Sequence, residues 1–283
     1  MDSKTTDVQS EQPGALLFNL AAQLSPRFLH ERSFAVRLGE LCTNRFLLSV
    51  SVGEIPGGVR EKILSVCRHM EMPSVQIELV GRHLSATRVL HLGFEERLKE
   101  RFYKIYLEQD TPTAAVARKP ILQHLGLKWD ALNPSRHMLT RYTWYPALSV
   151  AAIRQRVSEI CGIKGRTITE ELIDFVVGPI AKWDLRFLEA AESGNSRRSF
   201  DLNLYDAGIR LADIKPFLVR MWDHYRVEPA KWQSVFEADC RETLGHLSGG
   251  VHRSGEQFFN VYYGRSTAVV KGEQLPRLRN RAL

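Results

Sequence analysis

Five pairs of segments in which apolar and polar residues alternate recur along this 283-residue chain, and a short polar turn joins the members of each pair. Alternation with period two is typical of a β-strand with one buried face, and two such segments joined by a short turn form a hairpin. The pairs are Glu31–Leu41 with Arg45–Val52, Thr87–Glu95 with Arg101–Glu108, Lys128–Leu132 with His137–Tyr145, Trp183–Ala190 with Ser199–Tyr205, and His246–Val251 with Gln257–Tyr263. The pattern therefore predicts five hairpins.

Segments with helical spacing lie between the predicted hairpins. They are Gly58–His69, Ser74–Leu84, Thr113–Leu125, Ser149–Cys161, Thr169–Ile180, Leu211–Tyr225 and Pro229–Leu244. Ten strands in successive hairpins form one antiparallel sheet most economically, and closing that sheet into a barrel removes its unpaired edges. We predict an α+β fold, a ten-stranded antiparallel β-barrel of five hairpins surrounded by helices. Two smaller α+β domains with open sheets are the alternative.

The two ends of the chain differ in character from the rest. We expect residues 1–13 to be a flexible N-terminus, residues 14–270 to form a single domain, and residues 271–283 to be a basic C-terminal tail, because no Pro/Ser-rich linker interrupts the middle. The sequence shows neither a signal-peptide pattern nor eighteen consecutive apolar residues. We therefore expect a cytoplasmic protein with no membrane partner.

The charge balance favours an anionic partner. Lys and Arg number 39 against 32 Asp and Glu, giving a net charge of +7, which suits nucleic acid, phospholipid or a phosphorylated small molecule. The four cysteines form no CxxC pair, and the nine histidines show no HxxxH or HExxH arrangement. We accordingly predict no metal site and no disulfide framework.

The second strand of each predicted hairpin has one polar and aromatic face. If the apolar faces pack under the helices, the opposite faces point into the barrel. That face carries Arg45, Lys104, Tyr106, Arg141, Tyr145, Asn203, Tyr205, Asn260 and Tyr262. A solvated strand surface has a similar composition, so an outward-facing assignment is the alternative.

A lumen of this composition suits an allylic diphosphate. Buried guanidinium and ammonium groups require a multivalent anion, and they donate hydrogen bonds to phosphate oxygens, as phenols also do. Tyrosine rings offer π faces that attract a carbocation.

Four stretches carry a resemblance to a known family: KIY in Arg101–Glu108, RYTWY, FDLNLYDAGIRLADIKPFLVRMW and FNVYYG. They resemble the ABBA-type aromatic prenyltransferases, and most of all the cyanobactin peptide prenyltransferases, over residues 29 to 264. The resemblance implies transfer of a dimethylallyl group from dimethylallyl diphosphate to a side chain of a ribosomal peptide, either linear or macrocyclic. The co-substrate ionises to an allyl cation, which an electron-rich acceptor attacks.

The resemblance also implies roles for particular residues. Glu31 stands at the place of the acidic residue near the acceptor and would accept its proton. Arg45, Lys104, Tyr106, Arg141, Tyr145, Asn203, Tyr205, Asn260 and Tyr262 would hold the diphosphate and shield the cation. Tyr205 stands at the position of the barrel wall that limits the length of the prenyl group in this family. Because its side chain is bulky, we expect a five-carbon donor. Because no DDxxD motif is present, we expect at most Mg²⁺ bound loosely with the diphosphate. We also expect a monomer.

Several alternatives stay open. The acceptor can be a small aromatic molecule or a free amino acid instead of a peptide, and acidic residues at the mouth (Asp201, Glu108, Glu189) would indicate a cationic side chain such as arginine. His91, His246 and His252 lie on predicted strands, where they face the acceptor or serve the structure. A basic module that binds single-stranded nucleic acid is a different class of function, although dispersed basic residues and the lack of an RNP string lead us to expect no nucleic acid. A third class of function is a barrel that binds and carries a lipid or an isoprenoid without catalysing a reaction.

Overall fold

Eleven strands form one closed antiparallel sheet in the computed structural model, which describes residues 13–112, 117–161, 166–177, 185–195, 198–252 and 254–269. The strands are β1 (Arg27–Arg37), β2 (Glu40–Cys42), β3 (Arg45–Ser51), β4 (Thr87–Glu96), β5 (Arg101–Gln109), β6 (Ile121–Asp130), β7 (Asn133–Trp144), β8 (Arg186–Glu192), β9 (Arg198–Asn203), β10 (Leu244–Val251) and β11 (Gln257–Val269). The short β2 and the longer β3 pair with successive parts of β1, so together they occupy one of ten positions around the barrel. Pairing of β1 with β11 closes it, which confirms the predicted fold class.

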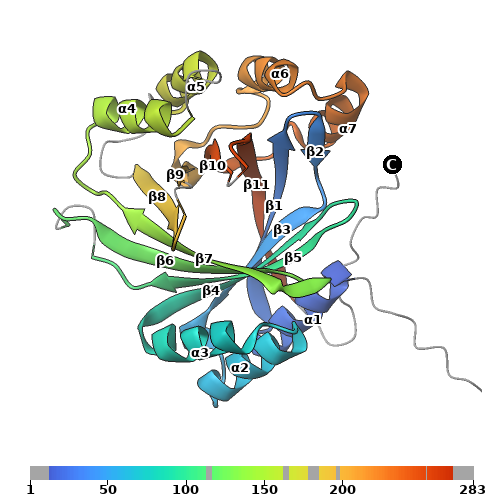
Figure 1. Cartoon of the computed structure of the whole chain (residues 1–283), viewed down its shortest axis with the longest axis vertical. Helices are drawn as coiled ribbons and strands as arrows, with labels where there is room; N and C mark the ends of the chain where they lie inside the picture. Colours follow the sequence, from blue (N-terminus) through green and yellow to red (C-terminus); the bar gives the residue numbers. More distant parts are fainter. Residues whose placement is uncertain are drawn as a thin grey trace, which may run out of the picture.

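Helices lie outside the barrel in two groups (Figure 1). The first group is α1 (Pro13–Leu24), α2 (Val59–His69) and α3 (Ser74–His83), and the second is α4 (Val150–Cys161), α5 (Arg166–Val177), α6 (Lys215–His224) and α7 (Pro229–Asp239). Six of these seven overlap segments predicted from helical spacing. Helix α1 was not predicted and begins at Pro13, the residue before the expected domain boundary.

The hydrophobic core lies between the barrel wall and the helices, in two parts. The first helix group packs on the outer faces of β3 to β6, where Trp129 is fully buried and donates a hydrogen bond from Nε1 to the Met70 carbonyl oxygen at 3.1 Å. The second group packs on β8 to β11, with the indoles of Trp222 and Trp232 stacked 4.1 Å apart. Apolar side chains thus point outward from the strands, and the alternate side chains are left for the lumen.

One predicted helix is wrong. Residues 121–125 of the predicted segment Thr113–Leu125 belong to β6, and residues 113–116 lie outside the described chain. A bulge between Leu122 and His124 breaks the alternation with β7, so that Leu122 and Leu125 imitate a helical spacing. The predicted strand Lys128–Leu132 likewise starts too late and runs into the turn after Asp130.

The terminal segments can be compared with the prediction only in part. Residues 1–12 and 270–283 lie outside the described residues, as does the start of the predicted strand Trp183–Ala190. In the described part of the chain, no helix combines the length and apolar character needed to cross a membrane.

Candidate active site

A cavity of about 520 Å³ fills the lumen and is lined by side chains from β1 and from β3 to β11. Alternation on each strand, with a diagonal offset of two residues between β4 and β5, gives its lining three levels on four neighbouring strands. The first level holds Arg45 (β3), Glu95 (β4), Lys104 (β5) and Lys128 (β6); the second Leu47, Gly93, Tyr106 and Gly126; the third Ser49, His91, Glu108 and His124. The first and third levels are four residues apart on each strand, or about 13 Å.

Glu95 stands at the centre of the first level. Its carboxylate, buried at 3% exposure, lies 2.5 Å from Lys104 Nζ, 2.9 Å from an Arg97 nitrogen, and 3.6 Å from both Arg45 Nε and Lys128 Nζ. Burial alone would raise the pKa of Glu95, but these cations, Lys104 foremost, hold it well below its usual range. Glu95 is therefore ionised and gathers four cations at one end of the cavity.

The carboxylates in contact with these cations, Glu95 and, at Arg97, Glu40 2.8 Å away, do not compensate them fully. Burial, with a smaller contribution from Arg45, lowers the pKa of Lys104 to about 8 although Glu95 is in contact with it. One carboxylate therefore does not offset the cost of burying this ammonium group. A multivalent anion placed here would supply the missing charge.

Tyrosines and amides lie next to the cations. Arg45 donates from Nη1 to Asn260 Oδ1 at 2.7 Å, and its guanidinium lies 5.7 Å from the centre of the Tyr262 ring. Tyr106 packs edge-on against Tyr142 with ring centres 5.8 Å apart. Burial raises the pKa of Tyr106 well above its usual value, so its phenol stays protonated and able to donate a hydrogen bond.

A second polar network surrounds Glu31 on β1. The Tyr205 hydroxyl donates to Glu31 Oε1, while His246 contacts Glu31 Oε2 at 3.2 Å through Nε2 and Asp201 Oδ2 at 2.9 Å through Nδ1. Burial acts to lower the pKa of His246, but Asp201 and Glu31 raise it well above its usual value. The imidazolium of His246 stacks on Tyr262 with ring centres 4.0 Å apart. Glu31 itself is 3% exposed, and Tyr205 and His246 stand between it and the cavity.

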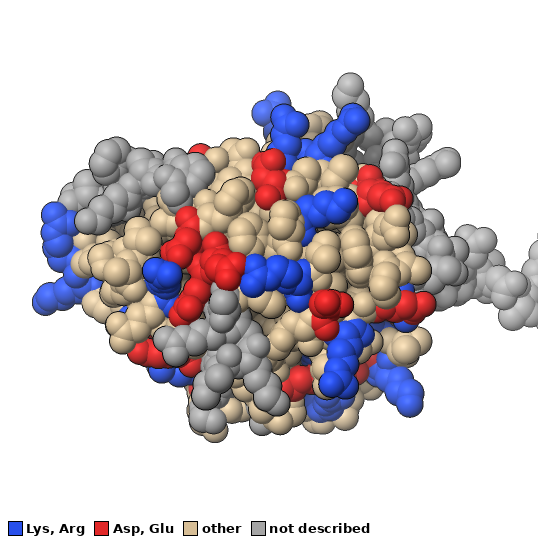
Figure 2. Space-filling model, turned by 90° about the horizontal axis from the view of Figure 1, so that it is seen from above, with Lys and Arg blue, Asp and Glu red and all other residues tan. Residues whose placement is uncertain are grey.

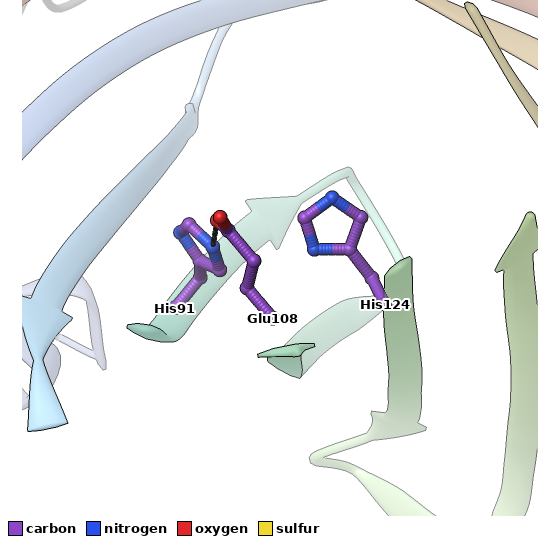
Figure 3. A group of neighbouring side chains, drawn as sticks. All are labelled: His91, Glu108 and His124. Carbon is purple, nitrogen blue, oxygen red and sulfur yellow. Dashed lines mark hydrogen bonds and ion pairs between the residues drawn. The ribbon is translucent and has the colours of Figure 1, made fainter. Parts of the chain in front are cut away.

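A third group lies on β4, β5 and β6. His91 Nε2 is 3.1 Å from Glu108 Oε2, and His124 faces the same space (Figure 3). Burial lowers the pKa of His124 to about 4, so the ring is neutral at pH 7. Burial opposes ionisation of Glu108, but the hydrogen bond with His91 lowers its pKa to about 2. The sequence motifs predicted no such cluster, because its members come from three strands.

Seven of the ten predicted site residues line the cavity: Arg45, Lys104, Tyr106, Asn203, Tyr205, Asn260 and Tyr262. Of the predicted acceptor-side residues, His91, His246, His252, Asp201 and Glu108 line it as well. Glu189 does not. It faces outward and forms ion pairs with Arg156 and Arg198.

The predicted inward orientation of Arg141 and Tyr145 is wrong. Arg141 lies against Leu79 and His83 of α3 on the outer face, and Tyr145 packs among the second helix group with Arg156 4.4 Å above its ring. Met138, Thr140 and Tyr142 of β7 line the cavity, so Arg141 lies on the opposite face, whereas the prediction places the aromatic face with Tyr142 and Trp144 against the helices. Tyr142 points into the cavity instead.

The charged and histidine lining residues that the sequence prediction missed include Glu95, Arg97, Lys128 and His124. All belong to the first strand of a hairpin or to the turn after it, whereas the predicted residues came from second strands. The sequence of β4 contains a pattern that indicates its lumen-facing residues, because the buried Leu90, Leu92 and Phe94 alternate with them. In β6 the bulge at Leu122 to His124 obscured the corresponding pattern.

Solved structures with a similar fold include ABBA-type aromatic prenyltransferases. The 5-dimethylallyl tryptophan synthase from Streptomyces coelicolor, in complex with DMASPP and Trp, aligns with a TM-score of 0.59 and 14% identity over 89% of this chain and 83% of that chain. PriB in complex with product diphosphate aligns with a TM-score of 0.58 and 13% identity over 90% of each chain. AnaPT from Neosartorya fischeri aligns with a TM-score of 0.50 and 15% identity over 88% of this chain and 80% of that chain. No family model and no curated protein matches the chain. Identities this low show a common fold, and the narrower resemblance to cyanobactin enzymes stays a prediction.

Proposed function

We propose that this chain is a prenyltransferase that moves a dimethylallyl group from dimethylallyl diphosphate to a nitrogen-bearing side chain. The observation that carries the proposal is the convergence of Arg45, Lys104, Lys128 and Arg97 on Glu95 at one end of a cavity whose walls are tyrosines. The ABBA-type fold, seen in relatives solved with diphosphate or DMASPP bound, supports the same interpretation.

In the proposed reaction the diphosphate occupies the cationic end. The allylic C–O bond breaks, its electron pair leaves with the diphosphate, and Lys104 and Arg45 stabilise the developing charge. The rings of Tyr106 and Tyr262 flank the allyl cation and keep water away from it. Loosely bound Mg²⁺ would accompany the diphosphate through its oxygens.

The acceptor then attacks the cation and must lose a proton. Because Tyr205 lines the cavity and donates its hydroxyl proton to Glu31, a proton passed to the Tyr205 oxygen can be matched by transfer of the Tyr205 proton to Glu31. Glu31 is then the final proton acceptor and Tyr205 the relay. Asp201 and His246 hold the second oxygen of Glu31 in place.

The acceptor that we propose is an amino-acid side chain with an N–H group, presented by a peptide or as a free aromatic amino acid. Carboxylates of Glu108 and Asp201 line the cavity beyond the tyrosines and can accept hydrogen bonds from indole, imidazole or guanidinium groups. The relatives were solved with L-tryptophan and brevianamide F.

On the face shown in Figure 2, Lys and Arg alternate with Asp and Glu and form no continuous basic surface. The cations that converge on Glu95 lie inside the barrel, where a nucleic-acid strand would not follow them. This arrangement favours a small anionic ligand over the nucleic-acid alternative.

The decisive experiment is mass spectrometry of the purified chain incubated with dimethylallyl diphosphate, with Mg²⁺ or with EDTA. Acceptors are free tryptophan, aromatic small molecules, and linear and cyclic peptides containing Trp, His or Arg. We expect one component to gain a C5H8 unit. Lys104→Met and Glu31→Gln should lower the rate by about 10²-fold or more, while Lys231→Met on exposed α7 should not. Absence of transfer, together with no thermal stabilisation by DMASPP, would overturn the proposal.

A further inference from the structure

His91, Glu108 and His124 bring three potential metal ligands together inside the barrel. One ligand atom from each lies within 4.8 Å of the other two. Figure 3 shows the carboxylate of Glu108 between the two imidazoles, all three directed into the same space. Two imidazole nitrogens and one carboxylate oxygen form a ligand set that proteins use for catalytic zinc and for other divalent transition metals.

The barrel wall fixes this arrangement. Glu108 on β5 pairs directly with His124 on β6, so the two side chains stand side by side on the inner face. His91 on β4 pairs with Tyr106, two residues before Glu108, and so lies diagonally across from the carboxylate. Neighbouring strands in the middle of a sheet move little relative to one another, which makes them a precise support for ligands.

Hydrogen bonds outside the cluster orient two of the three groups. Ser49, paired with His91 in the β3–β4 ladder, lies 2.8 Å from His91 Nδ1 through its hydroxyl. Nε2 of the same ring is thereby directed toward Glu108. Arg88 contacts the other carboxylate oxygen, Oε1. Partners of this kind, on the far side of each ligand, are what holds metal-binding imidazoles and carboxylates in position.

His124 makes no hydrogen bond to another described residue. Its ring is held by edge contacts with His91 and Tyr142, at 5.9 and 6.0 Å between ring centres. Both the ring and the Glu108 carboxylate line the cavity. A half-buried imidazole that faces the cavity and has no hydrogen-bond partner among the described residues is available to a ligand from that space.

We propose that His91, Glu108 and His124 bind one divalent transition-metal ion, with Zn²⁺ the best match. The ion takes His91 Nε2, Glu108 Oε2 and one nitrogen of His124, and its remaining position faces the cavity. Four ligands about 2.0–2.1 Å from zinc stand about 3.4 Å apart, so atoms that now lie within 4.8 Å of one another must approach by at most about 1.4 Å. Small rotations of side chains next to a cavity allow such a movement.

The site does not depend on the proposed prenyl transfer. It lies about 13 Å along the strands from the cationic cluster around Glu95. Its open position is accessible to water or to a nitrogen, oxygen or sulfur atom of an acceptor in the same cavity. Metal binding and group transfer can therefore be measured separately.

The test is direct titration of the full-length chain after treatment with a chelator and dialysis. Calorimetry with Zn²⁺ gives stoichiometry and affinity, and Co²⁺ gives visible absorption bands that report the coordination geometry. We expect one ion per chain. Glu108→Gln and His124→Gln should weaken binding by about 100-fold, and Ser49→Ala by about 10-fold or more. His69→Gln on α2 and His137→Gln on β7, both exposed histidines, should leave binding unchanged.

Folding of each variant is checked by circular dichroism and by its thermal unfolding transition. Ser49→Ala keeps all three ligands and retains the test if a ligand variant fails to fold. The proposal is overturned if less than one ion binds, or if Glu108→Gln and His124→Gln bind as the wild type does. Equal loss in the surface-histidine controls would also overturn it. If no ion binds while Glu108→Gln lowers prenyl transfer, the metal proposal is overturned and Glu108 acts on the acceptor directly.

Discussion

Glu95 is the residue on which the charge of the lumen depends. Replacing it with Gln leaves Arg45, Lys104 and their neighbours buried without their shared carboxylate. We expect Glu95→Gln to lower the free energy of unfolding by about 3–5 kcal/mol at pH 7. Because the folded-state pKa of Glu95 lies far below the ordinary 4.5, this stabilisation is present above pH 4.5 and is lost as pH falls toward the folded pKa. Urea denaturation at several pH values measures both effects.

Inorganic diphosphate gives the control for that variant. If the cations form the anion site, diphosphate should raise the melting temperature of Glu95→Gln more than that of the wild type. An equal or smaller rise would show that the stability loss comes from packing alone.

Lys104 makes a separate prediction about pH. With a pKa of about 8 in the free protein, its ammonium group is mostly charged at pH 7 and neutral above pH 9. Affinity for DMASPP should therefore weaken by up to tenfold per unit as pH rises above about 8. Measuring the pH dependence of Kd for Lys104→Met as well separates the effect of Lys104 from the effect of ionisation of DMASPP itself. If both proteins show the same pH dependence of Kd from pH 7 to 10, Lys104 does not hold the diphosphate.

His246 stabilises the fold through its charge. Its raised folded pKa means that this stabilisation is fully present below the unfolded value of about 6.5 and is lost as pH rises through the folded pKa. The difference in unfolding free energy between wild type and His246→Gln should be largest at pH 6 and smaller at high pH. A difference that grows with pH would show that the ring is neutral in the native state.

At the scale of elements, β6 makes room for the tyrosine walls of the cavity. A Cβ atom at Gly126 would lie 2.9 Å from Tyr142 and 3.0 Å from Tyr106. We expect Gly126→Ala to displace these rings, to cost about 1–3 kcal/mol of stability and to increase hydrolysis of the allylic donor relative to transfer. Gly53→Ala is the matched control, because nothing lies within 4 Å of a Cβ there. An unchanged ratio of donor hydrolysis to prenyl transfer in Gly126→Ala would show that the rings of Tyr106 and Tyr142 do not shield the cation.

The elements also show how far local patterns reach. Alternation predicts the faces of β5 and of β11 up to Tyr263 correctly, because each keeps one apolar face against the helices over that length. It fails at β6, where a bulge at Gln123 interrupts the alternation, and at β7, where the aromatic face that holds Tyr142 points into the lumen and Arg141 points outward. A bulge is set by its pairing partner, so it leaves no reliable trace in the strand's own residues.

For the whole molecule, the pairing of β1 with β11 joins residues more than 200 positions apart in the chain. A closed barrel has no edge at this pairing, so the central amides of β1 and β11 should exchange hydrogen as slowly as those of β5 and β6. Hydrogen exchange followed by mass spectrometry or NMR measures this. Much faster exchange confined to β1 and β11 would show a sheet that opens there.

The sequence by itself determined the architecture and identified seven of the ten predicted site residues correctly as lining residues, because period-two alternation and short turns are local properties of neighbouring residues. Arg45, Lys104, Tyr106 and Tyr262 face the lumen for that reason. Only the tertiary structure decided that Glu95 stands among four cations, that Glu31 lies behind Tyr205 and His246, and that His91, Glu108 and His124 meet. These contacts join separate strands, and the stagger between strands depends on bulges and barrel closure, which no single segment encodes.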